Sequence, residues 1–490
     1  MVFNDFPFWL RFAHFINLIF IVILIRSGIE ILSALPKLYW NDDAVPGKEW
    51  IKFTKKKFLP GFKNKVWISL EEEESFPSWL ALPGHKNLGM GRHWHFFSIV
   101  FWIANGVAYY SLLFSSDEWQ RLVPTSWTII PQAIHTMIQY STFNFSAASM
   151  GNPYDPIQQL AYFGVVFILG PFMIATGAAM SPAIGARFPR YPKIFRGRQV
   201  ARSLHFLGMI GFVLFIIIHI SMVMITNFSE NMGNIFLGKA ASFGIAVGIF
   251  ALFVIVVAAI QIWATGISLK KPRVIQKKLG YVIEPLKHIF FDKAESRQKF
   301  TKSSITSFFR ANGYPPDTQE YKELVESNFA NWKLKIHGLV ENPLELSLSD
   351  IQSIKKEIQI TEHSCIQGWT AIGEWAGISM NYIISMCQPL SEARYVIFYS
   401  FQYTEGDQFY EAITIEKAKH HQTILAYEMN GESLDIPHGY PIRLRVETQL
   451  GYKMVKWIKS IEFVSDYKSI GKGQGGHRED HMYYGTGAGI

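Results

Sequence analysis

Five long apolar stretches occupy most of the first 266 residues and restrict this half of the chain to a membrane fold. Four are evident at about 95–114, 157–180, 203–226 and 242–266, and a fifth, 8–34, has a shorter apolar centre with polar ends. A helix needs roughly 20 mostly apolar residues to cross the hydrocarbon core of a bilayer. We therefore expect a bundle of about five transmembrane helices, surrounded by phospholipid.

The chain beyond residue 269 has the composition of a globular protein. Short alternating segments at 332–337, 394–398, 442–446 and 460–464 predict strands, and Gly, Pro and Asn residues separate them. The expected fold is thus a membrane helical bundle followed by an α+β, β-rich domain. We expect the bundle at 1–269, a basic linker and entry segment at 270–329, the β-rich domain at 330–467 and an irregular Gly-rich tail at 468–490.

Charge and cysteine content exclude two classes of protein. The formal net charge is +8, and basic residues gather in loops and just after residue 269. Basic loops beside apolar spans suit a phospholipid headgroup layer, so we do not expect a nucleic-acid partner. Only two cysteines occur, Cys365 and Cys387, which excludes a disulfide framework.

Histidines inside the apolar stretches are the first candidate functional residues, because an ionisable side chain within a span is costly. His205 and His219 lie 14 residues apart on one expected helix. That spacing advances the helix by about 21 Å and turns it about four times, so one ring lies toward each leaflet on the same helix face. If the spans alternate in direction, His14 lies at the depth of His219. By the same alternation, His95 lies at the depth of His205.

Two histidines at each depth match the two axial ligands that one haem needs, so the pattern predicts two haems. His93 competes with His95 as a ligand, although His95 lies deeper in its apolar stretch. A lone histidine at such a position is more often an interfacial or hydrogen-bonded residue. The alternative is therefore a transporter-like or sensory membrane protein without haem, and the pairing of four histidines favours haem.

The membrane half resembles a known family over residues 8–226. The segments that carry the resemblance are the histidine pair 205/219 together with Arg92–Phe97, Leu160–Phe163, Thr176–Pro182 and Gly197–Arg202. The family is that of the di-haem cytochrome b subunits of bacterial formate dehydrogenases, hydrogenases and thiosulfate reductases. The resemblance implies a multi-pass protein of the bacterial inner membrane. It also implies that His14, His95, His205 and His219 bind two b haems that exchange electrons with membrane quinone.

In the β-rich part, one cysteine and two basic segments are candidate site residues. Cys365 follows a strand-like run, and basic residues stand among Gly and Pro turns at 435–443 and 451–457. A thiolate suits a soft metal, and lysine and arginine suit a phosphate-bearing cofactor. A buried structural thiol and a solvated basic surface account for the same residues, and the sequence pattern alone leaves both choices open.

Residues 300–467 are similar to the molybdopterin domain of the sulfite oxidase superfamily, in particular to the branch of the methionine sulfoxide reductase catalytic subunit. The similarity is carried by Cys365 with Trp369 and Trp375, by 438–443 and by 451–457. It implies that Cys365 is the molybdenum ligand and the catalytic residue. It implies further cofactor contacts at Asn312, Ser400, His438, Arg443, Met454, Val455 and Lys456.

Both resemblances together predict a membrane-bound molybdopterin-dependent oxidoreductase. It would transfer an oxo group on a small sulfur-containing substrate and exchange electrons with quinone through two b haems. Reduction of a sulfoxide is favoured over oxidation of sulfite. The alternative is a di-haem b-type electron-transfer protein whose soluble domain is a non-catalytic docking module.

The membrane side of the soluble domain is open. The connection 181–204 contains six basic residues and no acidic one, whereas 115–156 has Arg121 as its single basic residue. The positive-inside rule would place 181–204, and with it the soluble domain, in the cytoplasm. The resemblance favours the periplasm instead.

Overall fold

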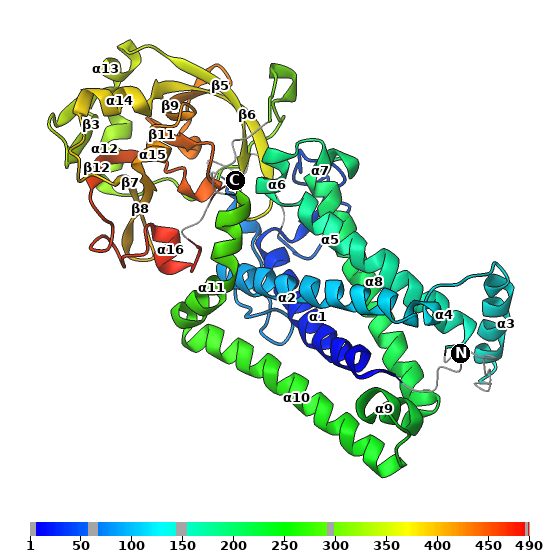
Figure 1. Ribbon diagram of the computed structural model, residues 1–490. Helices are drawn as coiled ribbons and strands as arrows, with labels where there is room; N and C mark the ends of the chain where they lie inside the picture. Colours follow the sequence, from blue (N-terminus) through cyan, green and yellow to red (C-terminus); the bar gives the residue numbers. More distant parts are fainter. Residues whose placement is uncertain (1–5, 57–66, 144–153, 292–297, 486–488, 490) are drawn as a thin grey trace. The chain divides into compact units, whose positions relative to one another are not determined.

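The computed structural model describes residues 6–56, 67–143, 154–291, 298–485 and 489, and it consists of two compact units (Figure 1). The helical unit comprises the chain up to Gly28, Trp94–Ala178 and Ala201–Lys270. The β-rich unit comprises Ile29–His93, Ala179–Val200 and the chain from Lys271 onward.

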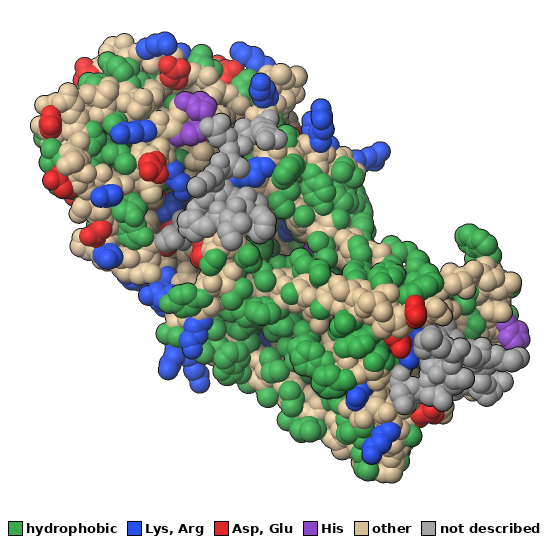
Figure 2. All heavy atoms as spheres, viewed as in Figure 1, with side chains coloured by type: hydrophobic (Ala, Val, Ile, Leu, Met, Phe, Trp, Pro, Cys, Tyr) green, Lys and Arg blue, Asp and Glu red, His purple; other side chains and the backbone are tan. Residues whose placement is uncertain are grey.

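Among the described residues, five helices are long and apolar enough to cross a membrane, which confirms the expected count, and most of their length lies in the helical unit. They are α1 (Phe8–Ala34), α2 (Leu88–Ser115), the third span Pro156–Ala179, α8 (Arg198–Ile225) and α10 (Phe243–Lys270). The third span consists of α4 (Pro156–Phe163), a π-helical segment (Gly164–Leu169) and α5 (Gly170–Ala179). Two shorter helices are α3 (Ile129–Ser141) and α9 (Phe228–Leu237). Apolar side chains occupy much of the visible surface of these helices (Figure 2), which suits contact with lipid.

The β-rich unit contains two five-stranded sheets. One has the order β10-β9-β6-β5 with β11 paired to β9, and the other has the order β4-β3-β12-β7-β8. Their strands are β3 (Lys333–Gly338), β4 (Leu344–Ser347), β5 (Glu357–Ser364), β6 (Thr370–Ser379), β7 (Tyr395–Thr404), β8 (Asp407–Thr414), β9 (Thr423–Met429), β10 (Glu432–Ser433), β11 (Arg443–Val446) and β12 (Ile458–Val464). Side chains from both sheets, among them Phe398 and Leu425, form one hydrophobic core.

Helices and a small ribbon complete the β-rich unit. The ribbon pairs β1 (Lys37–Leu38) with β2 (Ile51–Lys52). The helices are α6 (Pro182–Arg187), α7 (Tyr191–Ile194), α11 (Pro272–Phe291), α12 (Gln319–Glu326), α13 (Leu348–Ser353), α14 (Met380–Cys387), α15 (Ile415–Ala418) and α16 (His477–His481).

The predicted β-rich domain is confirmed, and the tail is partly different from the prediction. All four predicted strands are present as β3, β7, β11 and β12. The tail was expected to be irregular, and this is wrong for α16. Its residues His477 and Glu479 are fully buried, and Glu479 forms an ion pair with Lys453. Tertiary burial therefore orders a segment whose glycine content predicted irregular backbone.

The first and third connections between the spans belong to the β-rich unit. In the first connection, Ser69 donates its backbone N–H to the Ala311 carbonyl at 2.9 Å. At the end of the third, the Gln199 side chain donates to the Gly368 carbonyl at 2.8 Å. Five alternating spans require both connections and the chain after Lys270 to lie on one side of the membrane. Their contacts within one unit satisfy this requirement.

Candidate metal centres

His14 of α1 and His219 of α8 face each other within the helical unit. Their ring centroids lie 6.3 Å apart, and the ring planes are inclined by 63°. Two metal–nitrogen bonds of about 2 Å, plus about 1 Å from each nitrogen to its ring centre, span roughly 6 Å. The two imidazoles are therefore spaced as they would be on opposite sides of one metal ion.

A tyrosine hydroxyl contacts the Nδ1 nitrogen of His219. Tyr162 Oη on α4 lies 3.3 Å from His219 Nδ1, and Phe215 stacks on the imidazole with 5.6 Å between ring centroids. Metal-binding histidines normally use their second ring nitrogen for such a bond, which fixes the tautomer and the ring orientation. Donation from His219 Nδ1 to this hydroxyl would leave Nε2 for a metal.

A serine hydroxyl on α1 contacts the Nδ1 nitrogen of His95. Ser27 Oγ lies 3.1 Å from His95 Nδ1. Ser27 donates its own proton to the Ile23 carbonyl one turn earlier, at 2.7 Å, so its oxygen acts as an acceptor toward the histidine. Nδ1 of His95 then carries the ring proton, and Nε2 carries the lone pair that a metal needs.

Thr176 on α5 contacts His205 in the same way. Its hydroxyl lies 3.0 Å from His205 Nδ1 and donates to the Phe172 carbonyl at 2.8 Å. The neighbouring Gly177 brings the backbone close to the ring, because a β-carbon at this position would lie 3.4 Å from His205 Cε1. His205 is therefore oriented by a hydroxyl and by a packed helix backbone.

The same dipeptide pattern occurs at both of these histidines. Ser27–Gly28 faces His95, where a β-carbon at Gly28 would lie 3.6 Å from the ring Cε1, and Thr176–Gly177 faces His205. Our sequence reasoning missed both pairs. Each pair could have been found in the sequence as a hydroxyl residue followed by glycine inside an apolar span. A helix face in contact with lipid needs neither residue.

His93 is part of the β-rich unit. Its Nδ1 bonds to the Gly89 carbonyl one turn earlier at 2.8 Å. Its ring lines a cavity of about 620 Å³ together with residues of α11 and of the tail, such as Tyr281 and Tyr484. The surroundings of His93 therefore differ from the interhelical hydroxyl contact that His95 makes.

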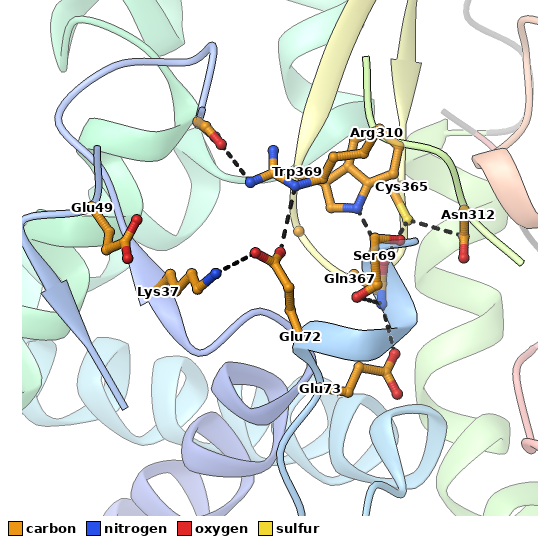
Figure 3. Close-up of polar contacts among 12 residues, drawn as sticks. Lys37, Glu49, Ser69, Glu72, Glu73, Arg310, Asn312, Cys365, Gln367 and Trp369 are labelled. Atoms are coloured by element: carbon orange, nitrogen blue, oxygen red, sulfur yellow. Dashed lines mark hydrogen bonds and ion pairs between the residues drawn. The ribbon is translucent and has the colours of Figure 1, made fainter. Parts of the chain in front are cut away.

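Cys365 follows β5 directly and is buried, with 3% of its surface exposed. Figure 3 shows its Sγ between two amide side chains. Asn312 Nδ2 donates to Sγ at 3.6 Å, and Gln367 Oε1 lies 3.5 Å from Sγ on the other side. Burial raises the pKa of the Cys365 thiol to about 12. The thiolate therefore requires a bound cation at this position.

Buried charges of the first connection lie next to the cysteine loop (Figure 3). Glu72 forms ion pairs with Lys37 and with Arg310, whose Nε lies 3.6 Å from the Glu72 carboxylate. Gln367 donates to the Glu73 carboxylate at 2.7 Å. Sequence reasoning missed these contacts, because it treated the first connection as a loop between spans.

Arg443 and Lys456 place two cations side by side near the cysteine site. Arg443 donates to the His438 carbonyl at 2.9 Å, and Lys456 donates to the Pro437 carbonyl at 2.7 Å. Burial, followed by repulsion from Arg445, lowers the pKa of Arg443 to about 9. Burial and repulsion from Arg443 lower the pKa of Lys456 well below its ordinary value. An anion bound between these cations would offset the cost of their burial.

Arg445 is a third buried cation of this region, and sequence reasoning missed its role. It forms two hydrogen bonds with the Glu447 carboxylate at 2.9 and 2.8 Å. Its guanidinium also donates to His363 Nδ1 at 2.9 Å. Burial and the neighbouring Arg445 keep the pKa of His363 well below its usual range. Arg445 is thus satisfied by protein groups, whereas Arg443 Nε has no hydrogen-bond partner among the described residues.

The other predicted cofactor contacts fall into two groups. Lys456 Nζ lies 3.4 Å from the Gly313 carbonyl, so its segment lies next to Asn312. Ser400 is fully buried, and its hydroxyl donates to the Lys456 carbonyl at 2.8 Å. Met454 and Val455 have their side chains in the hydrophobic core. The structure therefore brings these segments together, while the Ser400 hydroxyl and the two apolar side chains already have protein partners.

Two buried polar atoms of these segments lack a partner within the protein. Among the residues that the structure describes, Asn312 Oδ1 and Arg443 Nε are buried and have no hydrogen-bond partner. An unsatisfied buried polar group costs about 1–3 kcal/mol. His438 is close by, because its Nε2 lies 3.2 Å from the Phe309 carbonyl. A soft thiol, an open amide oxygen and an unsatisfied guanidinium fit a metal cofactor with an anionic organic part.

Comparison with known protein families matches two separate parts of the chain. Residues 5–238 match the family described as prokaryotic cytochrome b561. Residues 321–470 match the oxidoreductase molybdopterin binding domain.

Individual relatives match one half or the other. A protein of Azospira oryzae, named as a protein-methionine-sulfoxide reductase subunit, YedZ1, is 31% identical over 193 residues, which are 39% of this chain and 68% of that protein. The protein-methionine-sulfoxide reductase catalytic subunit MsrP of Campylobacter jejuni is 30% identical over 33% of this chain and 59% of its own length. The MsrP of Xanthomonas campestris is 31% identical over 27% of this chain and 45% of its own length.

Proposed function

The chain belongs to the family of prokaryotic cytochrome b561 proteins related to YedZ1, joined here to an oxidoreductase molybdopterin binding domain. From this premise we propose that it is a membrane-bound enzyme that reduces a sulfoxide-type substrate with electrons from membrane quinol. The observation that carries the proposal is the Cys365 site. It combines a buried thiol, an open Asn312 oxygen and an unsatisfied Arg443 guanidinium in one domain.

Two haems in the helical unit would carry the electrons. His14 and His219 would hold one, as the 6.3 Å spacing of their rings supports. His95 and His205 would hold the other, as the hydroxyls of Ser27 and Thr176 support by leaving Nε2 unprotonated. Haem iron supplies one-electron transfer, and the protein contributes the orientation and basicity of the imidazoles.

The β-rich unit would hold molybdopterin with molybdenum. Cys365 would be the metal ligand, and Asn312, His438, Arg443 and Lys456 would bind the organic part, with Ser400, Met454 and Val455 supporting their segments. When bound, this cofactor supplies two-electron oxygen-atom transfer. Burial of the site within Trp369 and Phe309, whose ring centroids lie 6.1 Å apart, keeps bulk water from the thiol.

Reduction of a sulfoxide is favoured over oxidation of sulfite by the names of the relatives. Three of them are named as subunits of protein-methionine-sulfoxide reductases. Methionine sulfoxide, free or within a protein, is accordingly the first substrate to try. Quinol would be the electron donor in that direction.

Metal and haem analysis of the full chain purified from membranes tests the proposal. We expect two b haems and one molybdenum per chain, and quinol-dependent reduction of methionine sulfoxide. A protein with haem but without molybdenum, made by cells that supply the cofactor, would contradict the proposed reaction. That result would favour the alternative, a di-haem electron-transfer protein with a docking domain.

A further inference from the structure

The turn between β7 and β8 meets the helix α16 of the tail at a cluster of metal-binding side chains. Glu405 lies in this turn, and His477 and His481 are the first and last residues of α16. One ligand atom from each of the three lies within 4.8 Å of the other two. Two histidines four residues apart on a helical turn project from one face, which is a spacing that zinc sites use.

His477 has an unused nitrogen inside the protein. The residue is fully buried, and its Nε2 lies 3.0 Å from the Thr404 carbonyl. Because a carbonyl oxygen only accepts hydrogen bonds, Nε2 of His477 carries the ring proton and donates it to this bond. Nδ1 then carries the lone pair. Among the described residues, Nδ1 of His477 has no hydrogen-bond partner. A buried lone pair without a hydrogen-bond donor can serve as a ligand for a metal ion.

His481 has a carboxylate at each ring nitrogen. Its Nε2 lies 2.9 Å from Asp407 Oδ2, and its Nδ1 lies 3.1 Å from Glu405 Oε2. Lys472 Nζ lies 3.2 Å from the same Nδ1. Because an ammonium group only donates, the contact with Lys472 is satisfied when Nδ1 is the acceptor and Nε2 donates to Asp407. In zinc sites a ligating histidine often donates its other ring N–H to a carboxylate, which is called its outer partner here.

We propose that His477 Nδ1, His481 Nδ1 and the Glu405 carboxylate bind a divalent transition-metal ion, with Asp407 as the outer partner of His481. Two imidazoles and one carboxylate are ligands that zinc prefers. Two ligand atoms of a tetrahedral zinc ion lie about 3.3 Å apart. His481 Nδ1 and Glu405 Oε2 are already 3.1 Å apart. The Lys472 ammonium, on an exposed side chain, moves to solvent when the ion binds.

The ion would attach the tail to the β7–β8 hairpin. The tail residue Glu479, between the two histidines, pairs with buried Lys453, and Lys453 pairs with Glu411 of β8 at 2.8 Å. The carbonyl of Glu479 also accepts from Arg273 of α11 at 2.7 Å. A metal at α16 would therefore stabilise the docking of the tail on the domain.

Zinc binding by the tag-free full chain tests this proposal. The protein is treated with a chelator, dialysed against graded zinc concentrations and assayed for zinc by mass spectrometry. We expect one zinc ion per chain, with at least tenfold weaker binding in Glu405→Gln and in His481→Gln. Asp407→Asn should weaken binding about 10–100-fold, as the loss of an outer partner does. Trypsin cleavage after Lys468 and Lys472 should slow when zinc is added to the wild type.

Two controls separate this site from other zinc-binding groups. Glu432→Gln removes an exposed glutamate next to another hairpin turn, and Cys365→Ser removes a thiol; both should keep the zinc ion. Glu405 is partly exposed, so its variant is expected to fold even if His481→Gln does not, and limited proteolysis of the β-rich unit outside the tail checks this. A wild type that binds no zinc would overturn the proposal. So would a folded Glu405→Gln variant with unchanged zinc affinity, because the contacts of His481 with Glu405 and Asp407 would then be hydrogen bonds within the protein and no part of a metal site.

Discussion

The hydroxyl of Thr176 lies 3.0 Å from Nδ1 of His205 and donates its own proton to the carbonyl of Phe172. With its proton on that carbonyl, the Thr176 oxygen is an acceptor for the ring N–H, which favours the His205 tautomer that presents Nε2. Ser27 does the same for His95. Ser27 of α1 and Thr176 of α5 thus each contact a histidine that another helix supplies.

Thr176→Val keeps the shape of the side chain and removes this hydrogen bond. Loss of the bond makes the imidazole less basic and stabilises oxidised iron less. A bond worth about 0.5–1.5 kcal/mol corresponds to an increase of about 20–60 mV in the midpoint potential of one haem. Potentiometric titration of the b-haem absorption measures the change. Ser111→Ala is the matched control, since Ser111 bonds to the Val107 carbonyl in the same way. Equal shifts in both variants would contradict the role of Thr176.

Haem content of histidine variants tests the pairing of the four ligands. Single alanine substitutions at His14 or His219 should each reduce the haem content from two to one per chain. The double variant of these two residues should still contain one haem, because both ligands serve the same iron. Combining His14→Ala with His205→Ala should remove both haems. The pyridine haemochrome assay gives the ratio, and His93→Ala should retain two haems. Loss of both haems in the first double variant would show that the pairing is wrong.

The lowered pKa of Arg443 predicts a pH dependence of stability in the cofactor-free protein. Its value in the folded state, about 9, lies below the ordinary 12.5. Between these two pH values the unfolded chain binds more protons than the folded chain. The free energy of unfolding therefore rises with pH, by at most about 1.4 kcal/mol per pH unit. Urea unfolding of cofactor-free wild type and Arg443→Met between pH 8 and 10 measures this. The rise should be smaller in Arg443→Met, whereas Lys459→Met should behave as the wild type. A variant with the full rise would contradict the account.

Much of the fold followed from the sequence because its signals are local. The spans and the strands at 394–398 and 442–446 are apolar or alternating runs that local reading detects. The partners of the site residues were not predictable in this way. The contact of Gln367 with Glu73 joins residues that are 294 positions apart. The helix α16 was missed because its order depends on buried ion pairs with distant residues, such as Lys453.

The membrane side of the β-rich unit can be tested with reporter fusions at the C-terminus. We propose the periplasmic side, on the resemblance to the methionine sulfoxide reductase branch. An alkaline phosphatase fusion should then be active, and a green fluorescent protein fusion exported unfolded should be dark. The six basic residues of the third connection predict the opposite. A bright fluorescent fusion with an inactive phosphatase fusion would place the unit in the cytoplasm.

The most direct test of the central claim is whether a sulfoxide oxidises the haems through Cys365. The full chain is reduced with dithionite under anaerobic conditions, excess reductant is removed, and methionine sulfoxide is added while the b-haem absorption is followed. We predict that the wild type and Cys387→Ser are reoxidised, because Cys387 lies at the end of α14 in the hydrophobic core, where its thiol contacts the Ile384 carbonyl. Cys365→Ser should keep its haem spectrum and remain reduced. Reoxidation of Cys365→Ser at the rate of the wild type would contradict the account.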